Sequence, residues 1–171
     1  MADHYGSLAG ASAYIATLAN GAAWAGSSDE ARTSALARAS RSLDGVYGAR
    51  FPGTKTGRRA QSLAWPRTGA LDHCTGETIP ANDVPAEIEH AAYALALAEL
   101  RTPGATSPEV TPGRLVKRQK VEGLEREFFG AGDGAQTSAE AMRPVNMMVE
   151  DALRCLLVKA SGGASVCVVR V

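Results

Sequence analysis

The stretch DVPAEIEHAAYALALAEL, residues 83–100, constrains the fold more than any other part of the sequence. At helical spacing its apolar residues cover two different faces, one containing Ile88 and Leu95 and the other containing Tyr93 and Leu97. A helix that is apolar on most sides is buried on most sides. The stretch therefore predicts a central helix that other helices surround.

Three further segments predict those surrounding helices. The first is Leu8 to Leu18, and the second begins after Ser27, which forms a capping box with Glu30, and runs to Tyr47. The third lies within residues 145–160. In the central helix we expect Asp83 to cap the N-terminus and Pro85 to lie in the first turn. One shared core is expected to contain Leu36, Leu43, Ile88, Leu95, Leu153 and Leu156.

The remaining segments predict a long loop, a hairpin and a tail. Residues 48–81 hold many glycines and prolines and read as irregular, and residues 114–122 are expected to pair with 124–129. The fold class is mainly α: a small helical bundle with a β-hairpin and an extended C-terminal tail. We expect one domain over residues 1–163, with residues 164–171 as the tail.

Composition suggests that the chain associates with copies of itself. Hydrophobic residues make up 45% of the chain, but many are alanine and only 5% of residues are aromatic, so the core buries little area for its size. The net charge is zero, yet the charged residues are mainly basic within residues 28–67 and mainly acidic within residues 70–110. This asymmetry fits either contacts within one chain or head-to-tail contacts between copies.

The cysteines and the N-terminus suggest an intracellular protein. The three cysteines, Cys74, Cys155 and Cys167, are odd in number and lack metal-ligand spacing, so we expect no disulfide and a reducing cytoplasm. We also expect no signal peptide and no transmembrane helix.

The polar residues do not predict an enzyme. His73 and Cys74 are adjacent and follow Asp72, but this cluster is too small for a metal site, and His90 reads as a solvated helix residue. A nucleophile needs a base beside it and a group that orients the base, and no such set is found. We therefore expect no catalytic residue, no metal and no cofactor.

Several cations suggest weak contact with DNA. Lys55, Arg58 and Arg59 precede Trp65, which offers one surface for stacking. The segment VKRQK, residues 116–120, reads either as a basic strand that contacts phosphates or as an edge that charge protects from aggregation.

The order of these pieces resembles one family of phage proteins. The segments LAWPRTG, IPANDVPAEIEHAAYALALAEL and VKRQKVEGLEREF follow YGSLAGASAYIA and a long basic helix. Over nearly the whole chain they are similar to tailed-phage proteins labelled DnaT-like single-stranded-DNA-binding, and they also resemble the head–tail adaptor proteins of phage necks. The pair Ala94 and Leu95 after Tyr93 is a mild departure from the pattern of this family.

The two resemblances imply different functions. An adaptor is a structural virion protein that forms a ring, typically dodecameric, beneath the portal protein, extends the DNA channel and docks the tail or nozzle protein. It is assembled in the host cytoplasm and resides in the virion neck. The alternative is a DnaT-like single-stranded-DNA-binding protein. We favour the adaptor, because the small-residue helices, the divided charge and the tail suit a ring subunit.

The adaptor resemblance leads to expectations for individual residues. The corner formed by Trp65, Pro66 and Arg67 is expected to dock into a neighbour. Alternatively, Trp65 covers the domain's own core, and the two roles can coexist. Residues that we expect at other interfaces are Arg41, Arg58, Val166, Val168 and Val171. Residues that we expect to face packaged DNA, without sequence preference, are Arg59, Lys117, Arg118 and Lys120.

The C-terminal segment SVCVVRV, residues 165–171, is expected to leave the helical body. A short β-branched strand can add to the edge of another sheet, and we expect the portal protein or a neighbouring subunit to supply that edge. Alternatively, the segment completes a sheet beside the chain's own hairpin.

Overall fold

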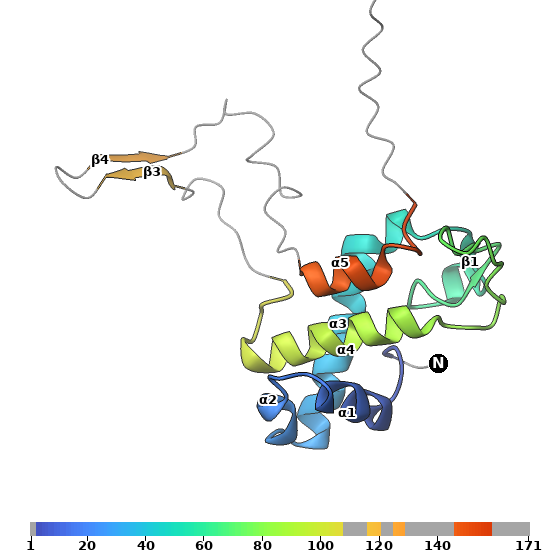
Figure 1. Ribbon diagram of the computed structural model, residues 1–171, viewed down its shortest axis with the longest axis horizontal. Coiled ribbons are helices and arrows are strands. Elements are labelled where there is room, and N and C mark those ends of the chain that lie inside the picture. The colour runs from blue at the N-terminus through green and yellow to red at the C-terminus, as the bar shows by residue number, and fades with distance from the viewer. Residues whose placement is uncertain (1–2, 108–115, 121–124, 129–145, 159–171) are drawn as a thin grey trace, which may run out of the picture.

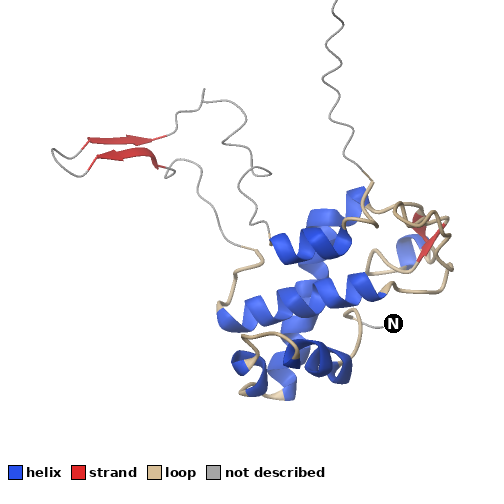
Figure 2. Ribbon diagram, in the orientation of Figure 1, coloured by secondary structure: helices blue, strands red, loops and turns tan. Residues whose placement is uncertain are grey.

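A computed structural model describes residues 3–107, 116–120, 125–128 and 146–158. The helices are α1 (Leu8–Ala16), α2 (Ala22–Ala25), α3 (Asp29–Tyr47), α4 (Ala86–Arg101) and α5 (Met147–Leu153). Two single-turn helices, η1 (Gly48–Arg50) and η2 (Arg58–Ala60), lie between α3 and α4. The protein is mainly helical, as predicted (Figure 2).

Helix α4 lies at the centre of the helical body (Figure 1). It contacts α3 most extensively, packs against α5, and also contacts α1 and α2. Ile88 on α4 is fully buried with Leu43 of α3 and Leu153 of α5 in one cluster. A second cluster joins Leu97 of α4 to Ala11 and other residues of α1, α2 and α3. The predicted central helix is therefore confirmed.

The ends of two helices differ in detail from the prediction. Helix α3 is capped by Ser28, whose hydroxyl accepts a hydrogen bond from the Ala31 N–H at 3.3 Å, rather than by Ser27. Ser27 instead follows Gly26, the C-cap of α2, and donates its hydroxyl to the carbonyl of Ala23 at 2.6 Å. Helix α4 has Pro85 at its N-cap and no side-chain cap, so Asp83 does not cap it as expected.

The loop between α3 and α4 contains a small antiparallel sheet that was not predicted. Strand β1 (Thr54–Lys55) pairs with β2 (Arg67–Thr68), and one further bridge joins Leu71 to Thr78. Each strand has two residues, which is too short for a periodic pattern to be read from sequence.

The predicted hairpin is present in the described backbone. Strand β3 (Val116–Lys120) pairs with β4 (Glu125–Phe128) antiparallel, with an irregularity between Val116 and Arg118. The hairpin lies apart from the helices (Figure 1). The C-terminal segment 164–171 lies outside the described residues, so its expected docking remains a prediction.

Cys74 and Cys155 form a disulfide, which overturns the expectation that no disulfide is present. The two residues are separated by 81 positions, and their Cα atoms are 5.2 Å apart. The fold brings the loop after β2 to the end of α5, and a count of cysteines does not reveal such a contact. Within the described residues no helix is both long and apolar enough to span a membrane.

Leu95 is the one member of the predicted core set that is not buried. Five of the six expected residues are at most 2% exposed, whereas Leu95 is half-buried and borders a cavity of about 360 Å³ between α3, α4 and the start of α5. Leu36 also belongs to the second cluster and not the first. The expected set is therefore divided between two clusters.

The partial exposure of Leu95 lowers the expected cost of truncating it. We expect Leu95→Ala to reduce the free energy of unfolding by about 1–2 kcal/mol, below the roughly 2–5 kcal/mol of a fully buried leucine. Leu43→Ala is the matched control, because Leu43 is fully buried on the facing helix. Urea denaturation measures the free energy of unfolding of both variants. Equal losses in the two would contradict the conclusion that Leu95 is only half-buried.

Glu99 on α4 is buried and fully engaged in hydrogen bonds. Its carboxylate accepts from Arg38 Nε at 3.1 Å, from the Gly104 N–H at 3.1 Å and from the Thr106 hydroxyl at 3.0 Å. Burial opposes ionisation, but these hydrogen bonds outweigh it and lower the pKa of Glu99. Arg38 comes from the mainly basic segment and Glu99 from the mainly acidic one, so for this pair the charge asymmetry is used within one chain.

The pKa of Glu99 is lower in the folded protein than in the unfolded chain, so its ionised carboxylate stabilises the fold above the unfolded pKa. This stabilisation is lost as the pH falls through the folded pKa. We expect Glu99→Gln to lower the free energy of unfolding by about 1–3 kcal/mol at pH 7 and to weaken its decrease below about pH 4. Glu87→Gln, on the exposed side of α4, is the control. Urea denaturation at pH 7 and below pH 4 measures the stability of each protein. Equal losses of stability between the two pH values in Glu99→Gln and in wild type would contradict this prediction.

Candidate nucleic-acid interface

In the corner formed by Trp65, Pro66 and Arg67, the first and last residues are buried and Pro66 is half-buried. Trp65 is 2% exposed and packs edge-on against Phe51, with ring centroids 5.8 Å apart, and the peptide bond before Pro66 is cis. An exposed knob requires a side chain that a neighbour can reach. Trp65 therefore covers the domain's own core, as one of the two expectations had it, and its expected docking role stays a prediction.

Arg67 holds this corner through its guanidinium group. Its nitrogens donate four hydrogen bonds to backbone carbonyls: Nε to Pro52 at 2.6 Å, Nη2 to Gly53 at 2.6 Å and to Phe51 at 3.3 Å, and Nη1 to Ala64 at 3.3 Å. Burial lowers the pKa of Arg67, and the nearby Tyr5 and Asp44 oppose this. These donors are used inside the chain, and the expected interface role of Arg67 stays a prediction.

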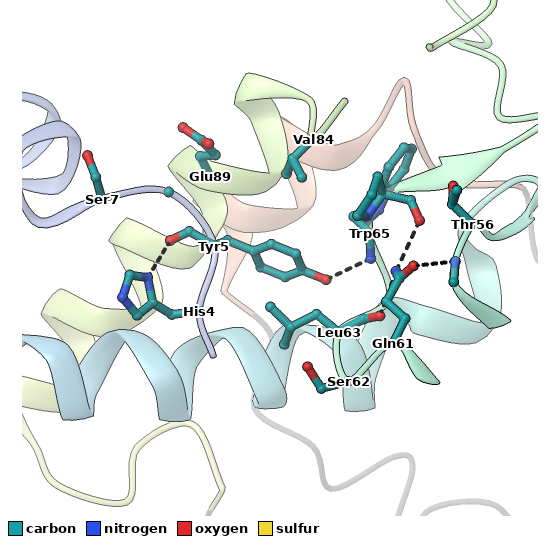
Figure 3. Close-up of a pocket in the computed structure, with 13 residues that line it drawn as sticks. His4, Tyr5, Ser7, Thr56, Gln61, Ser62, Leu63, Trp65, Val84 and Glu89 are labelled. Carbon is teal, nitrogen blue, oxygen red and sulfur yellow. Dashed lines mark hydrogen bonds between the residues drawn. The ribbon is translucent and has the colours of Figure 1, made fainter. Parts of the chain in front are cut away.

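Tyr5 and Asp44 join the N-terminal segment to the same corner. The Tyr5 hydroxyl accepts the Trp65 N–H at 3.1 Å (Figure 3). The same hydroxyl donates to Asp44 Oδ1 at 2.6 Å, and Asp44 Oδ2 accepts the Ala64 N–H at 2.7 Å. Burial raises the pKa of Asp44, and the hydrogen bond from Tyr5 partly opposes it. Burial also raises the pKa of Tyr5.

A pocket of about 590 Å³ lies beside this network (Figure 3). The residues that line it come from the N-terminal segment, the loop before Trp65 and the start of α4, and they include Tyr5, Gln61 and Glu89. The Gln61 side chain braces the loop, because Nε2 donates to the carbonyls of Leu63 at 2.9 Å and Pro66 at 3.0 Å.

The braced loop presents a group of cations on the surface. Residues 54–61, here called the basic loop, border a shallow hollow of about 400 Å³ lined by Thr54, Lys55, Arg58, Arg59 and Gln61. Arg58 and Arg59 are exposed and take part in no ion pair within the part of the chain that the structure describes.

The backbone of the basic loop is held in place on both sides. Gln61 Oε1 accepts the Gly57 N–H at 2.9 Å, and the Thr56 N–H donates to the Pro66 carbonyl at 3.2 Å. Arg58 has a φ of 51°, a left-handed conformation that few residues other than glycine adopt. Exposed cations on a fixed backbone suit contact with phosphate groups, which needs charge but no base recognition.

The other predicted site residues are not all brought together. Arg41 is exposed on α3, whereas Arg32 pairs with Asp29 at 2.9 Å and donates to carbonyls of α2. Lys117, Arg118 and Lys120 lie on β3, apart from the basic loop in Figure 1. Val166, Val168 and Val171 lie outside the described residues. Their expected roles therefore remain predictions.

Asp72, Cys74 and Cys155 bring potential metal-ligand atoms within 4.8 Å of one another. Both sulfurs are joined in the disulfide, so they are not available as thiolates in this state. His90, which was expected to be solvated, is exposed but stacks on Tyr14, with ring centroids 4.5 Å apart.

Sequence reasoning did not identify the polar residues that support the corner. Ser40 and Asp44 lie four residues apart on the face of α3 that contains Ala39, Leu43 and Tyr47. Ser40 is fully buried and accepts the Tyr5 N–H at 3.0 Å. Two polar residues within an apolar stripe were therefore the signal that a buried network was present.

Comparison with known proteins assigns the chain to a family. No curated protein and no solved structure matches it significantly. A family described as "Putative DnaT-like ssDNA binding protein" matches residues 1–171. Because the match covers the entire chain, the protein belongs to this DnaT-like family.

Proposed function

We propose that the protein is a structural virion protein, a subunit of a head–tail adaptor ring that binds the portal protein, extends the DNA channel and docks the tail or nozzle protein. The burial of the aromatic side chains favours this function over single-stranded-DNA binding. Proteins that bind single strands without sequence preference combine a basic groove with aromatic side chains on which bases stack. This chain has the cations, but its described aromatic side chains serve the core.

Six of the aromatic side chains are at most 4% exposed: Tyr5, Trp24, Tyr47, Phe51, Trp65 and Tyr93. Tyr14 is half-buried, and His90 stacks on its ring. Among the Tyr, Trp and Phe side chains that the structure describes, none therefore offers a fully open face for a base to stack on. The basic loop can still contact phosphates, and such contact is what a subunit beside a DNA channel requires.

Features of the helical body are also consistent with a ring subunit. The helices are rich in alanine, which lets neighbouring subunits approach closely. Apolar side chains are exposed around α5, where Met147 is 67% exposed, Met148 48% and Val158 43%. The proposed role is structural, without a catalytic step or a cofactor, in the neck of a virion.

Binding to a portal protein tests the proposal. Purified full-length protein is mixed with assembled portal, and the mixture is separated by size-exclusion chromatography. We expect co-elution in a complex, and expect a deletion of residues 164–171 that leaves the thermal unfolding transition intact to abolish it. A protein that never co-elutes with the portal would contradict the proposal. If the deletion instead removes cooperative unfolding, the tail belongs to the core.

The alternative function, single-stranded-DNA binding, is favoured by the description of the matching family. The two functions differ in their preference between DNA forms. An adaptor that contacts phosphates through the basic loop should bind single-stranded and double-stranded DNA weakly and with similar affinity. A DnaT-like protein should bind single strands much more tightly than duplex.

The basic loop leads to a specific prediction for DNA affinity. We expect Arg58→Ala with Arg59→Ala to weaken DNA binding about tenfold near 100 mM salt and to reduce the salt slope by about 2, because two phosphate contacts are lost. Arg101→Ala with Arg154→Ala is the control, since both residues are exposed elsewhere on the body. Fluorescence anisotropy measures the DNA affinity of both double variants. An equal loss of affinity in the two would show that the contact with DNA is not specific to the basic loop.

A further inference from the structure

The disulfide joins the loop between β2 and α4 to the chain just after α5. Cys74 lies in the loop between β2 and α4, and Cys155 lies just beyond Arg154, the C-cap of α5. In sequence, α5 connects the hairpin region to residues 159–171. A bond at Cys155 therefore fastens the helix that lies between these two segments.

We infer that Cys74 and Cys155 form a reversible redox clasp, which holds α5 to the body when oxidised and lets it detach more readily when reduced. Cys74 is exposed and Cys155 is half-buried, so a small thiol reagent can reach the bond. Exposed disulfides are the labile ones, whereas structural disulfides resist reduction. The inference does not depend on the proposed function.

The loop that carries Cys74 is held by hydrogen bonds that do not involve sulfur. Asp72 Oδ1 accepts the N–H groups of Cys74 at 2.7 Å and Thr75 at 3.2 Å, and the Asp72 N–H donates to Glu77 at 2.9 Å. The hydrogen bonds to Cys74 and Thr75 lower the pKa of Asp72, which keeps the carboxylate ionised as an acceptor. Cys74 should therefore keep its position after the bond opens.

Helix α5 also has contacts that survive reduction. Val149, Leu153, Leu156 and Leu157 are buried in the main cluster. The His73 N–H donates to the Cys155 carbonyl at 2.8 Å, and the Val158 N–H donates to the Arg50 carbonyl at 2.8 Å. Because both cysteines remain adjacent while α5 stays docked, the bond can form again without refolding of the body.

The exchange balances with ordinary thiol reagents. A dithiol such as dithiothreitol gives two electrons and two protons to the sulfurs, the S–S bond breaks to two thiols, and the reagent leaves as its cyclic disulfide. Oxidised glutathione reverses the step: the S–S bond forms again, and two molecules of reduced glutathione leave with the electrons and protons.

Hydrogen exchange on the full-length protein tests the clasp. The oxidised protein is compared with the same protein in 5 mM dithiothreitol, and alkylation with mass spectrometry reports which cysteines are free. We expect amide exchange in α5 to accelerate at least tenfold on reduction, exchange in α3 to change far less, and oxidised glutathione to restore the slow rate. We also expect the thermal midpoint to fall by about 10 °C.

Two variants separate the clasp from other effects of the reagent. Cys74→Ser should exchange in α5 like the reduced wild type and should not respond to dithiothreitol, whereas Cys167→Ser should respond like the wild type. The inference fails if the bond survives dithiothreitol in the folded protein, if α3 and α5 accelerate together, or if Cys74 is found paired with Cys167. The wild-type comparison stands even if Cys74→Ser does not fold.

Discussion

Replacement of Arg67 by alanine should lower the free energy of unfolding by roughly 3–5 kcal/mol. Its guanidinium donates to the carbonyls of Phe51, Pro52, Gly53 and Ala64, and Arg67 is only 8% exposed. Removing the donors leaves buried carbonyls without partners, and water does not readily replace a buried planar group. The loss is therefore larger than that of an ordinary surface arginine.

Two further variants make this result specific to the geometry of Arg67. Arg67→Lys keeps the charge but not the planar set of donors, so we expect it to recover only part of the lost stability. Arg59→Ala removes an exposed arginine and should change stability by less than about 0.5 kcal/mol. Urea denaturation of the three variants measures the changes. If Arg67→Ala were as stable as Arg59→Ala, the guanidinium would not be holding the corner.

Trp65→Ala should also lower the free energy of unfolding strongly, by about 3–5 kcal/mol. Trp65 is 2% exposed in the main cluster, and Phe51 packs against its ring. Its indole Nε1 has no hydrogen-bond partner among the described residues. Trp65→Phe keeps an aromatic ring and removes that unpaired N–H, so we expect it to cost less than about 1.5 kcal/mol.

The same pair of variants separates a core role from a docking role. A core role predicts that Trp65→Phe remains folded and still assembles, while Trp65→Ala loses thermal stability before any loss of assembly can be measured. The outcome that contradicts it is Trp65→Ala with the wild-type thermal midpoint but without binding to its partners. Differential scanning fluorimetry beside the portal-binding experiment measures both properties.

The helices and the hairpin could be predicted from sequence because local patterns determine them. Apolar residues at helical spacing identified α3 and α4, and alternating residues around a turn identified β3 and β4. The helix starts were less certain because Ser27 and Ser28 are adjacent, and either can cap α3. Ser27 bonds back to the carbonyl of Ala23 in α2, and Ser28 is the residue that caps α3.

The buried side of the site could not be predicted because its contacts join residues far apart in sequence. Tyr5 reaches Asp44 and Trp65, and Cys74 reaches Cys155. The sequence shows Trp65 and Arg67 as residue types that often dominate interfaces, but the same types also stabilise cores. Burial, which depends on the whole fold, decides between these roles. The sequence does place the cations of the basic loop together, because Arg58 and Arg59 are neighbours in the chain, and their expected roles stay predictions.

Electron microscopy of the purified full-length protein, alone and with the portal protein, tests the proposed function most directly. The adaptor proposal predicts rings with a central channel on the portal, with the basic loop or strand β3 facing that channel. A protein that stays monomeric, never forms rings on the portal, and binds single-stranded DNA far more tightly than duplex would contradict the adaptor and support the DnaT-like function.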